Sequence, residues 1–139
     1  MDAVNRAKSL CDRGRELHNA RRLEEAVEVY KEALAIYRQL AEQHPHEYLP
    51  EVAWTLRALA DTLYSLRRLD EAINAYGEAL TIHQQLTPEV FDFGIAQSLW
   101  RLGKTLHRLQ QSEEALKALE KASATLRRLA RRRSPEYET

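Results

Sequence analysis

Apolar and small residues recur along this chain in three stretches that share one pattern. The phrases RRLEEAVEVYKEAL at residues 21–34, RRLDEAINAYGEAL at 67–80 and QQSEEALKALEKAS at 110–123 each place two alanines seven residues apart, with an apolar residue between them. Upstream of each phrase, a small residue is flanked by leucines about one turn away on either side. Spacings of three, four and seven residues mark one face of an α-helix. The chain therefore predicts a pair of helices three times over, in copies offset by 46 and then 43 residues.

Residues that break helices fall between these predicted elements. His44-Pro45-His46 and Leu49-Pro50 predict the end of one long helix and the start of the next, and Thr87-Pro88-Glu89 predicts an N-cap followed by proline at the first helical position. We therefore expect an all-α fold, with one domain over residues 1–133 and a polar tail at 134–139. The predicted repeats lie at about 7–47, 53–87 and 96–132, and the six predicted helices near 3–19, 23–43, 50–66, 70–86, 89–109 and 113–132.

The small residue in each first helix is at Gly14, Ala60 or Gly103. Antiparallel helices pack with their axes about 8 to 10 Å apart, and the short end of that range requires a small residue at the crossing. A glycine inside a helix costs about 1 kcal/mol relative to alanine. We therefore expect a close approach of two helices at each of these positions.

With these residues the chain resembles the tetratricopeptide repeat family, whose signature is W-x2-L-G-x2-Y followed by A-x3-F-x2-A. The units are longer than the usual 34 residues and are similar to the roughly 42-residue repeats of kinesin light chains. The resemblance spans about residues 5–130 and implies a right-handed α-solenoid of three helix-turn-helix repeats, a non-catalytic scaffold for protein–protein interaction. The matching residues are Leu10, Gly14, Leu17, Ala26, Tyr30 and Ala33, with Arg13 at a normally apolar position; Leu56, Leu59, Ala60, Leu63, Ala72, Tyr76 and Ala79; and Leu99, Leu102, Gly103, Leu106, Ala115, Leu119 and Ala122.

The inner wall of such a superhelix comes mainly from the first helix of each pair. The residues that the packing stripe leaves free on these helices are mostly basic or aromatic, and we expect them to form a concave groove for a partner peptide of acidic character. Arginine and lysine would hold carboxylates, and aromatic residues would supply apolar anchors. The predicted groove residues are Lys8, Arg15, His18, Asn19, Trp54, Arg57, Asp61, Tyr64, Gln97, Trp100, Arg101, Lys104, His107 and Arg108, with Cys11 in the same set.

Two alternatives apply to this groove. Trp54 and Trp100 could instead fill space between adjacent repeats, as buried aromatic residues commonly do. The basic residues could equally be an ordinary solvated helix face.

Composition narrows the classes of function. The chain has 139 residues with 21 basic and 21 acidic side chains, so its zero net charge does not by itself favour nucleic acid or membrane. The sequence contains no apolar run of about 18 residues, and the single Cys11 fits a reducing compartment. We therefore expect a soluble, cytoplasmic protein.

Residues capable of catalysis or metal binding are sparse. His44 and His46 have no cysteine or carboxylate at ligand spacing, so no metal or cofactor is expected. His83 falls on a packing stripe and is expected in the core. Cys11 has no histidine and acid arranged to activate it, which predicts an inert surface or groove cysteine rather than a nucleophile. The sequence thus predicts that the protein is not an enzyme.

The C-terminal part suggests two further functions. The run RRLARRR at 127–133 places cations at a helix C-terminus, where they stabilise the helix, and it could also contact nucleic acid. The last predicted helix carries a broad apolar face formed by Leu116, Leu119, Leu126 and Leu129, and end repeats of a solenoid usually need a cover. Self-association through the terminal repeats is therefore an alternative role, and weak nucleic-acid binding is another.

Overall fold

A computed structural model describes residues 2–86, 100 and 103, and within them the chain forms four α-helices and no strand. These helices are α1 (Ala3–Asn19), α2 (Leu23–Gln43), α3 (Pro45–Ser65) and α4 (Leu69–Leu86). The all-α prediction is confirmed for this part of the chain, and the bounds of α1 and α2 are those predicted. Trp100 and Gly103 are also helical. The rest of the predicted fifth helix, at 89–109, and the predicted sixth helix, at 113–132, lie outside the described residues.

The start predicted for the third helix is wrong by five residues. Helix α3 begins at Pro45 directly after its N-cap residue His44, and Pro50 lies inside the helix. Proline suits the first helical position because its φ is already helical and the N–H that it lacks would have no partner there. Pro50 was predicted to occupy that position, but Pro45 takes it. Because Pro50 has no N–H, the carbonyl of His46 lacks its usual helical hydrogen bond.

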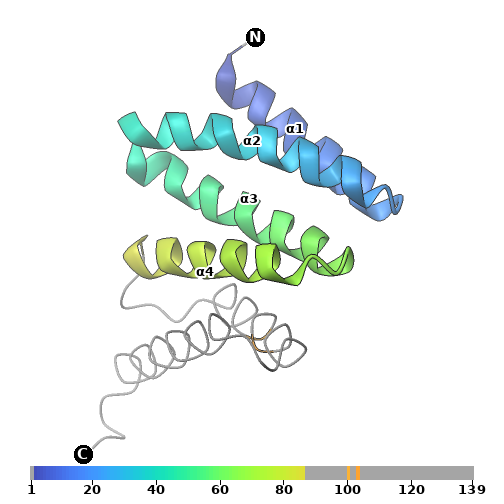
Figure 1. Cartoon of the computed structure of the whole chain (residues 1–139). Coiled ribbons are helices and arrows are strands. Elements are labelled where there is room, and N and C mark those ends of the chain that lie inside the picture. The colour runs from blue at the N-terminus through green and yellow to red at the C-terminus, as the bar shows by residue number, and fades with distance from the viewer. Residues whose placement is uncertain (1, 87–99, 101–102, 104–139) are drawn as a thin grey trace, which may run out of the picture.

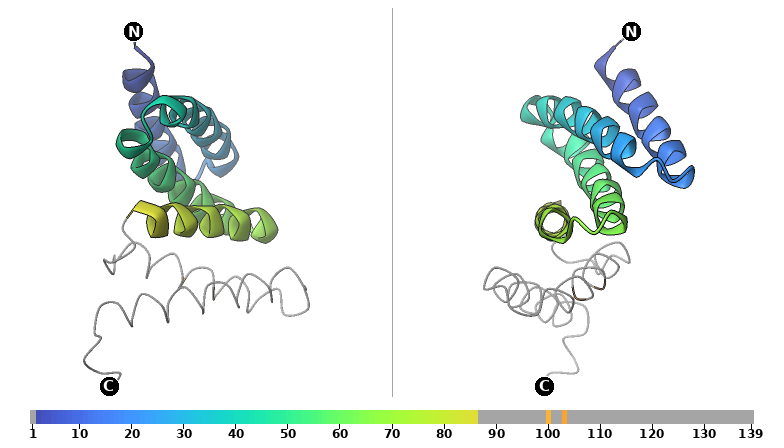
Figure 2. Two further views of the ribbon diagram at one scale, coloured as in Figure 1. Left: turned by 90° about the vertical axis from the view of Figure 1, so that its left-hand side faces the viewer. Right: turned by 45° about the vertical axis from the view of Figure 1, so that its right-hand side comes forward.

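The four helices form two hairpins that stack on each other (Figure 1). Helix α2 packs against α1 and α3, and α3 packs against α4. The two hairpin turns lie on one side of the stack and the α2–α3 connection lies on the other (Figure 1). In the right-hand view of Figure 2, α4 is seen end-on while α1 runs across the view, so the helix direction rotates along the stack.

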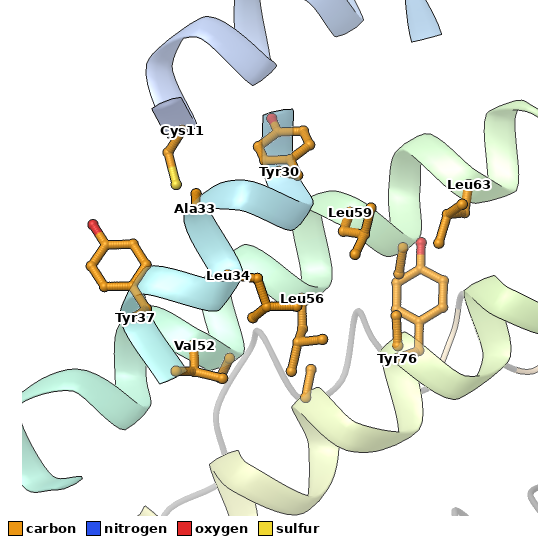
Figure 3. Close-up of a cluster of buried hydrophobic side chains, with 14 of the residues drawn as sticks. Cys11, Tyr30, Ala33, Leu34, Tyr37, Val52, Leu56, Leu59, Leu63 and Tyr76 are labelled. Atoms are coloured by element: carbon orange, nitrogen blue, oxygen red, sulfur yellow. The ribbon is translucent and has the colours of Figure 1, made fainter. Parts of the chain in front are cut away.

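The core consists of the residues that define the repeated pattern. Ala26, Ala33, Ala72 and Ala79 are fully buried, as their seven-residue spacing predicts. Aromatic and branched side chains from successive helices fill the space between them (Figure 3). The larger members of this core are Leu17, Val27, Tyr30, Leu34, Tyr37, Val52, Leu56, Leu59, Leu63, Ile73, Tyr76, Leu80 and Ile82.

The close approach predicted at Gly14 is confirmed. A Cβ added to Gly14 would lie 2.7 to 3.0 Å from three ring atoms of Tyr30, so glycine lets α1 rest directly on that ring. Ala60 is fully buried at the same register of α3. A Cβ at Gly103 would meet no heavy atom within 4 Å. Within the described part of the chain, the close approach predicted at Gly103 is therefore not confirmed.

Both hairpin turns have the same backbone structure, with an arginine in the left-handed region. Arg21 and Arg67 each have φ of 65°. In the first turn, the N–H of Arg21 donates to the carbonyl of His18 and that of Arg22 donates to Leu17, at 3.0 and 2.9 Å. The second turn repeats both bonds 46 residues later. This pair of bonds is the Schellman helix ending, in which the left-handed position favours glycine.

Replacing Arg67 by glycine is expected to raise the free energy of unfolding by about 1 kcal/mol, because a side chain in the left-handed region is disfavoured by roughly that amount. Urea denaturation followed by circular dichroism would measure the change. Ser65→Gly, two residues earlier inside α3, is the matched control. It should lower stability by about 0.5 kcal/mol, because glycine is a poor residue inside a helix. If Arg67→Gly were destabilising, the proposed backbone strain would be wrong.

Candidate functional site

The described groove residues divide between two helices. Lys8, Arg15, His18 and Asn19 belong to α1, and Trp54, Arg57, Asp61 and Tyr64 belong to α3. Within each helix their spacing of three, four and seven residues places them along one side. Helices α1 and α3 touch each other, which brings the two rows together, and we call this surface the α1–α3 face. Trp100 is described separately, and Gln97, Arg101, Lys104, His107 and Arg108 lie outside the described residues.

Both tryptophans are large apolar side chains that face solvent. Trp54 is 41% exposed, although Ala53 and Thr55 on either side of it are fully buried. Trp100 is 66% exposed. These exposures argue against the alternative in which either tryptophan fills space between repeats.

The α1–α3 face carries less unpaired positive charge than its residue types suggest. Arg15 pairs with Asp12 on its own helix, with Nη2 2.6 Å from Oδ1. The Asp61 carboxylate accepts a hydrogen bond from the Tyr76 hydroxyl on α4, so this predicted groove residue also ties α3 to α4. Lys8, which is exposed, and Arg57, which is half-buried, form no ion pair with any other described residue. These two cations are therefore available for an external carboxylate.

Cys11 is a correction to the predicted groove. It is 6% exposed and lies between α1 and α3, with its sulfur 3.7 Å from Oγ1 of Thr55. Figure 3 shows its side chain near Ala33 and Tyr37 of α2. The helical register places Cys11 beside the groove residues, but α3 covers it. Burial raises the pKa of the thiol, and the contact with Thr55 opposes this shift; the neutral, buried thiol agrees with the inert chemistry expected for it.

His18 occupies a similar position two turns later. It is half-buried, and its Nδ1 lies 2.8 Å from Oγ1 of Thr62. The two threonines of α3 are thus seven residues apart and meet two residues of α1 that are also seven apart. Both threonines are fully buried, and neither was predicted from the sequence. Their seven-residue spacing is visible in the sequence, but their burial and their partners on α1 are not.

Buried tyrosines support this face from the second helix. Burial raises the pKa of Tyr30 to about 12, and the nearby Cys11 and Asp61 add to the effect while Arg15 opposes it. The Tyr30 phenol is therefore neutral at physiological pH.

His83 is half-buried in α4, as predicted for a core histidine.

Two other kinds of feature are missing from the described residues. The part of the chain that the structure describes holds no group of three histidine, cysteine or acidic side chains positioned for a metal ion. No helix among the described residues is long and apolar enough to cross a bilayer.

Comparison with known proteins adds one match. A family model described as tetratricopeptide repeat matches residues 17–85 and 51–128. Together the two matched segments span most of the chain, including residues beyond α4. No curated protein and no solved structure matches the chain.

Proposed function

The chain belongs to the tetratricopeptide repeat family, whose members generally mediate protein–protein interaction, and we propose that it binds a peptide segment of a partner protein along the α1–α3 face. The proposed role is that of a non-catalytic scaffold. The buried thiol of Cys11 supports this role, because a neutral, enclosed sulfur is a poor nucleophile. A free cysteine also supports a reducing compartment such as the cytoplasm.

The proposed architecture has three repeats in a right-handed solenoid of six helices within residues 1–133. The family match extends to residue 128, which supports a third unit after α4. The leucines, glycine and alanines of that unit stand in the register of the first two units. Under this proposal, Trp100 extends the α1–α3 face onto the first helix of the third repeat.

The exposure of Trp54 is the observation that carries the proposed function. A tryptophan side chain exposes a large apolar area at the surface, and tryptophan is among the residues that contribute most to binding at interfaces. Arg57 lies one helical turn after Trp54, and Lys8 lies on the adjacent α1 row. An apolar anchor with two available cations fits a peptide that combines an apolar side chain with acidic residues.

Peptides selected from a random phage-displayed library on the purified chain would test this proposal. We expect the selected peptides to pair an aromatic or aliphatic residue with glutamate or aspartate. Trp54→Ala should weaken their binding at least tenfold, as truncation of an interface anchor usually does. Fluorescence anisotropy of a labelled peptide would measure the affinity.

A matched pair of charge reversals separates the proposed face from the rest of α1. Lys8→Glu should weaken binding of an acidic peptide and make it less sensitive to salt. Arg6→Glu introduces the same change on the same exposed helix, but two residues away and so on another side, and should leave affinity nearly unchanged. Equal effects of the two reversals, or no effect of Trp54→Ala, would refute the assignment to this face.

The two alternative roles depend on residues 116–133. Self-association was predicted from the apolar face of the last helix, and nucleic-acid binding from the run at 127–133. Both segments lie outside the described residues, so these roles stay predictions.

A further inference from the structure

The hydroxyl of Thr62 makes two contacts and has one proton to share. Its Oγ1 donates to the carbonyl of Ala58 on the preceding turn, at 3.0 Å, and lies 2.8 Å from Nδ1 of His18. If Nδ1 of the imidazole had no proton, it would compete with the carbonyl for that one hydrogen, and only one of the two contacts could be a hydrogen bond. Both contacts are satisfied together when Nδ1 carries a hydrogen and donates to Oγ1.

The second contact between α1 and α3 has the same arrangement. Oγ1 of Thr55 donates to the carbonyl of Glu51 at 2.7 Å and lies 3.7 Å from the Cys11 sulfur. The proton of that hydroxyl is likewise directed to its own helix, which leaves its oxygen able to accept from the Cys11 thiol. In both contacts, a threonine oxygen of α3 can therefore serve as an acceptor for a side chain of α1.

A proton on Nδ1 determines the chemistry of the other ring nitrogen. In a neutral imidazole with Nδ1–H, Nε2 is an acceptor and cannot donate. Nε2 of His18 forms no hydrogen bond with the described residues, and it is not among their buried polar atoms that lack a partner. It therefore reaches solvent, on a residue that lies beside Arg15 and Asn19 in the α1 row.

We propose that Thr62 holds neutral His18 as the Nδ1–H tautomer, so that the α1–α3 face presents Nε2 as a hydrogen-bond acceptor for a backbone N–H of the bound peptide. This inference rests on the proposed function, because the peptide is the expected donor. Thr62 is thus a positioning residue, which acts on the partner through His18. The Nε2–H tautomer, which predominates in a free histidine side chain in water, would instead present a donor and repel a peptide N–H.

The tautomer can be measured without any peptide. Long-range ¹H–¹⁵N correlation spectra of the ¹⁵N-labelled chain, at a pH about two units above the ordinary imidazole pKa of 6.5, distinguish a protonated from an unprotonated ring nitrogen. His18→Gln identifies the signals among those of the five histidines. We expect a protonated Nδ1 in the wild type and in Thr62→Ser, which keeps the hydroxyl. Thr62→Val should shift the ring toward the Nε2–H form.

Thr55→Val is the matched control, because it removes the other threonine hydroxyl and should leave the His18 signals in place. A wild-type His18 protonated at Nε2 would overturn the proposal. A tautomer that is the same in Thr62→Val, Thr62→Ser and the wild type would overturn it as well. Circular dichroism would confirm that each variant remains helical.

Peptide affinity tests the recognition step. With a peptide selected on the wild type, Thr62→Val should weaken binding about 3- to 10-fold, as expected for one lost hydrogen bond, whereas Thr62→Ser and Thr55→Val should bind within about twofold of the wild type. Unchanged affinity in Thr62→Val would overturn the acceptor role of Nε2 and leave the proposed function intact. Loss of binding in Trp54→Ala tests that function independently.

Discussion

Replacing Tyr76 by alanine is expected to lower the free energy of unfolding by about 3 to 5 kcal/mol, the usual cost of removing a buried aromatic ring. Tyr76 is 1% exposed, and its ring points from α4 toward Leu59 and Leu63 of α3 (Figure 3). Without the ring, these leucines would border a cavity that helices fixed by many other contacts cannot close. Urea denaturation monitored by circular dichroism would measure the loss. It should be the largest of the single-residue effects predicted for this chain.

Tyr76→Phe isolates the contribution of the hydroxyl. The phenylalanine ring fills the same space but cannot donate to the carboxylate of Asp61. We expect a loss of about 1.5 kcal/mol, at the lower end for hydrogen bonds to charged groups, because Asp61 is half-buried and partly solvated. If Tyr76→Ala cost no more than Tyr76→Phe, the ring would contribute little and the cavity argument would be wrong.

The helices could be predicted because each has a clear apolar period. Both ends of α1 and α2 lie at the predicted residues, and the start of α4 differs from its prediction by one residue. The start of α3 could not be derived from local rules, because Pro45 and Pro50 both suit a first helical turn. The choice between the two prolines depends on the path of the chain after α2. The pattern of apolar residues does not specify that path.

The surface of the first helices was predictable in part. Register alone placed Trp54 on the side that the core leaves free, and the structure exposes it. Register also placed Cys11 on that side. This prediction was wrong because the helical register takes no account of neighbouring helices. Residues at the edge of one first helix are covered by the next, so the exposure of Cys11 depends on the position of α3.

Thr55 and Thr62 illustrate a second limit. A threonine inside a helix commonly bonds to the carbonyl four residues earlier, so its presence in the sequence does not indicate a partner on another helix. Their contacts with Cys11 and His18 depend on the crossing of α1 and α3. Asp61 is a similar case, because its bond to Tyr76 depends on the packing of α3 against α4.

The two described glycines within α1 and α4 should respond to the same substitution with opposite signs. Gly14→Ala is expected to lower the free energy of unfolding by about 1 to 3 kcal/mol, the usual cost of overpacking a core. The new methyl group would lie 2.7 Å from Cε1 and 2.8 Å from Cζ of Tyr30. That ring is rigid and 3% exposed, so relief requires α1 to move away from α2. The expected loss remains after the gain of about 1 kcal/mol in helix propensity.

Gly77→Ala is the matched control within α4. A Cβ at Gly77 would meet no heavy atom within 4 Å, so the gain in helix propensity should appear alone and raise stability by about 0.5 to 1 kcal/mol. Thermal and urea unfolding of the two variants beside the wild type would measure both changes. If both substitutions were stabilising, the contact between Gly14 and Tyr30 would not limit the packing of the first hairpin. The opposite signs would instead show that glycine is required where α1 crosses α2, whereas Gly77 only weakens α4.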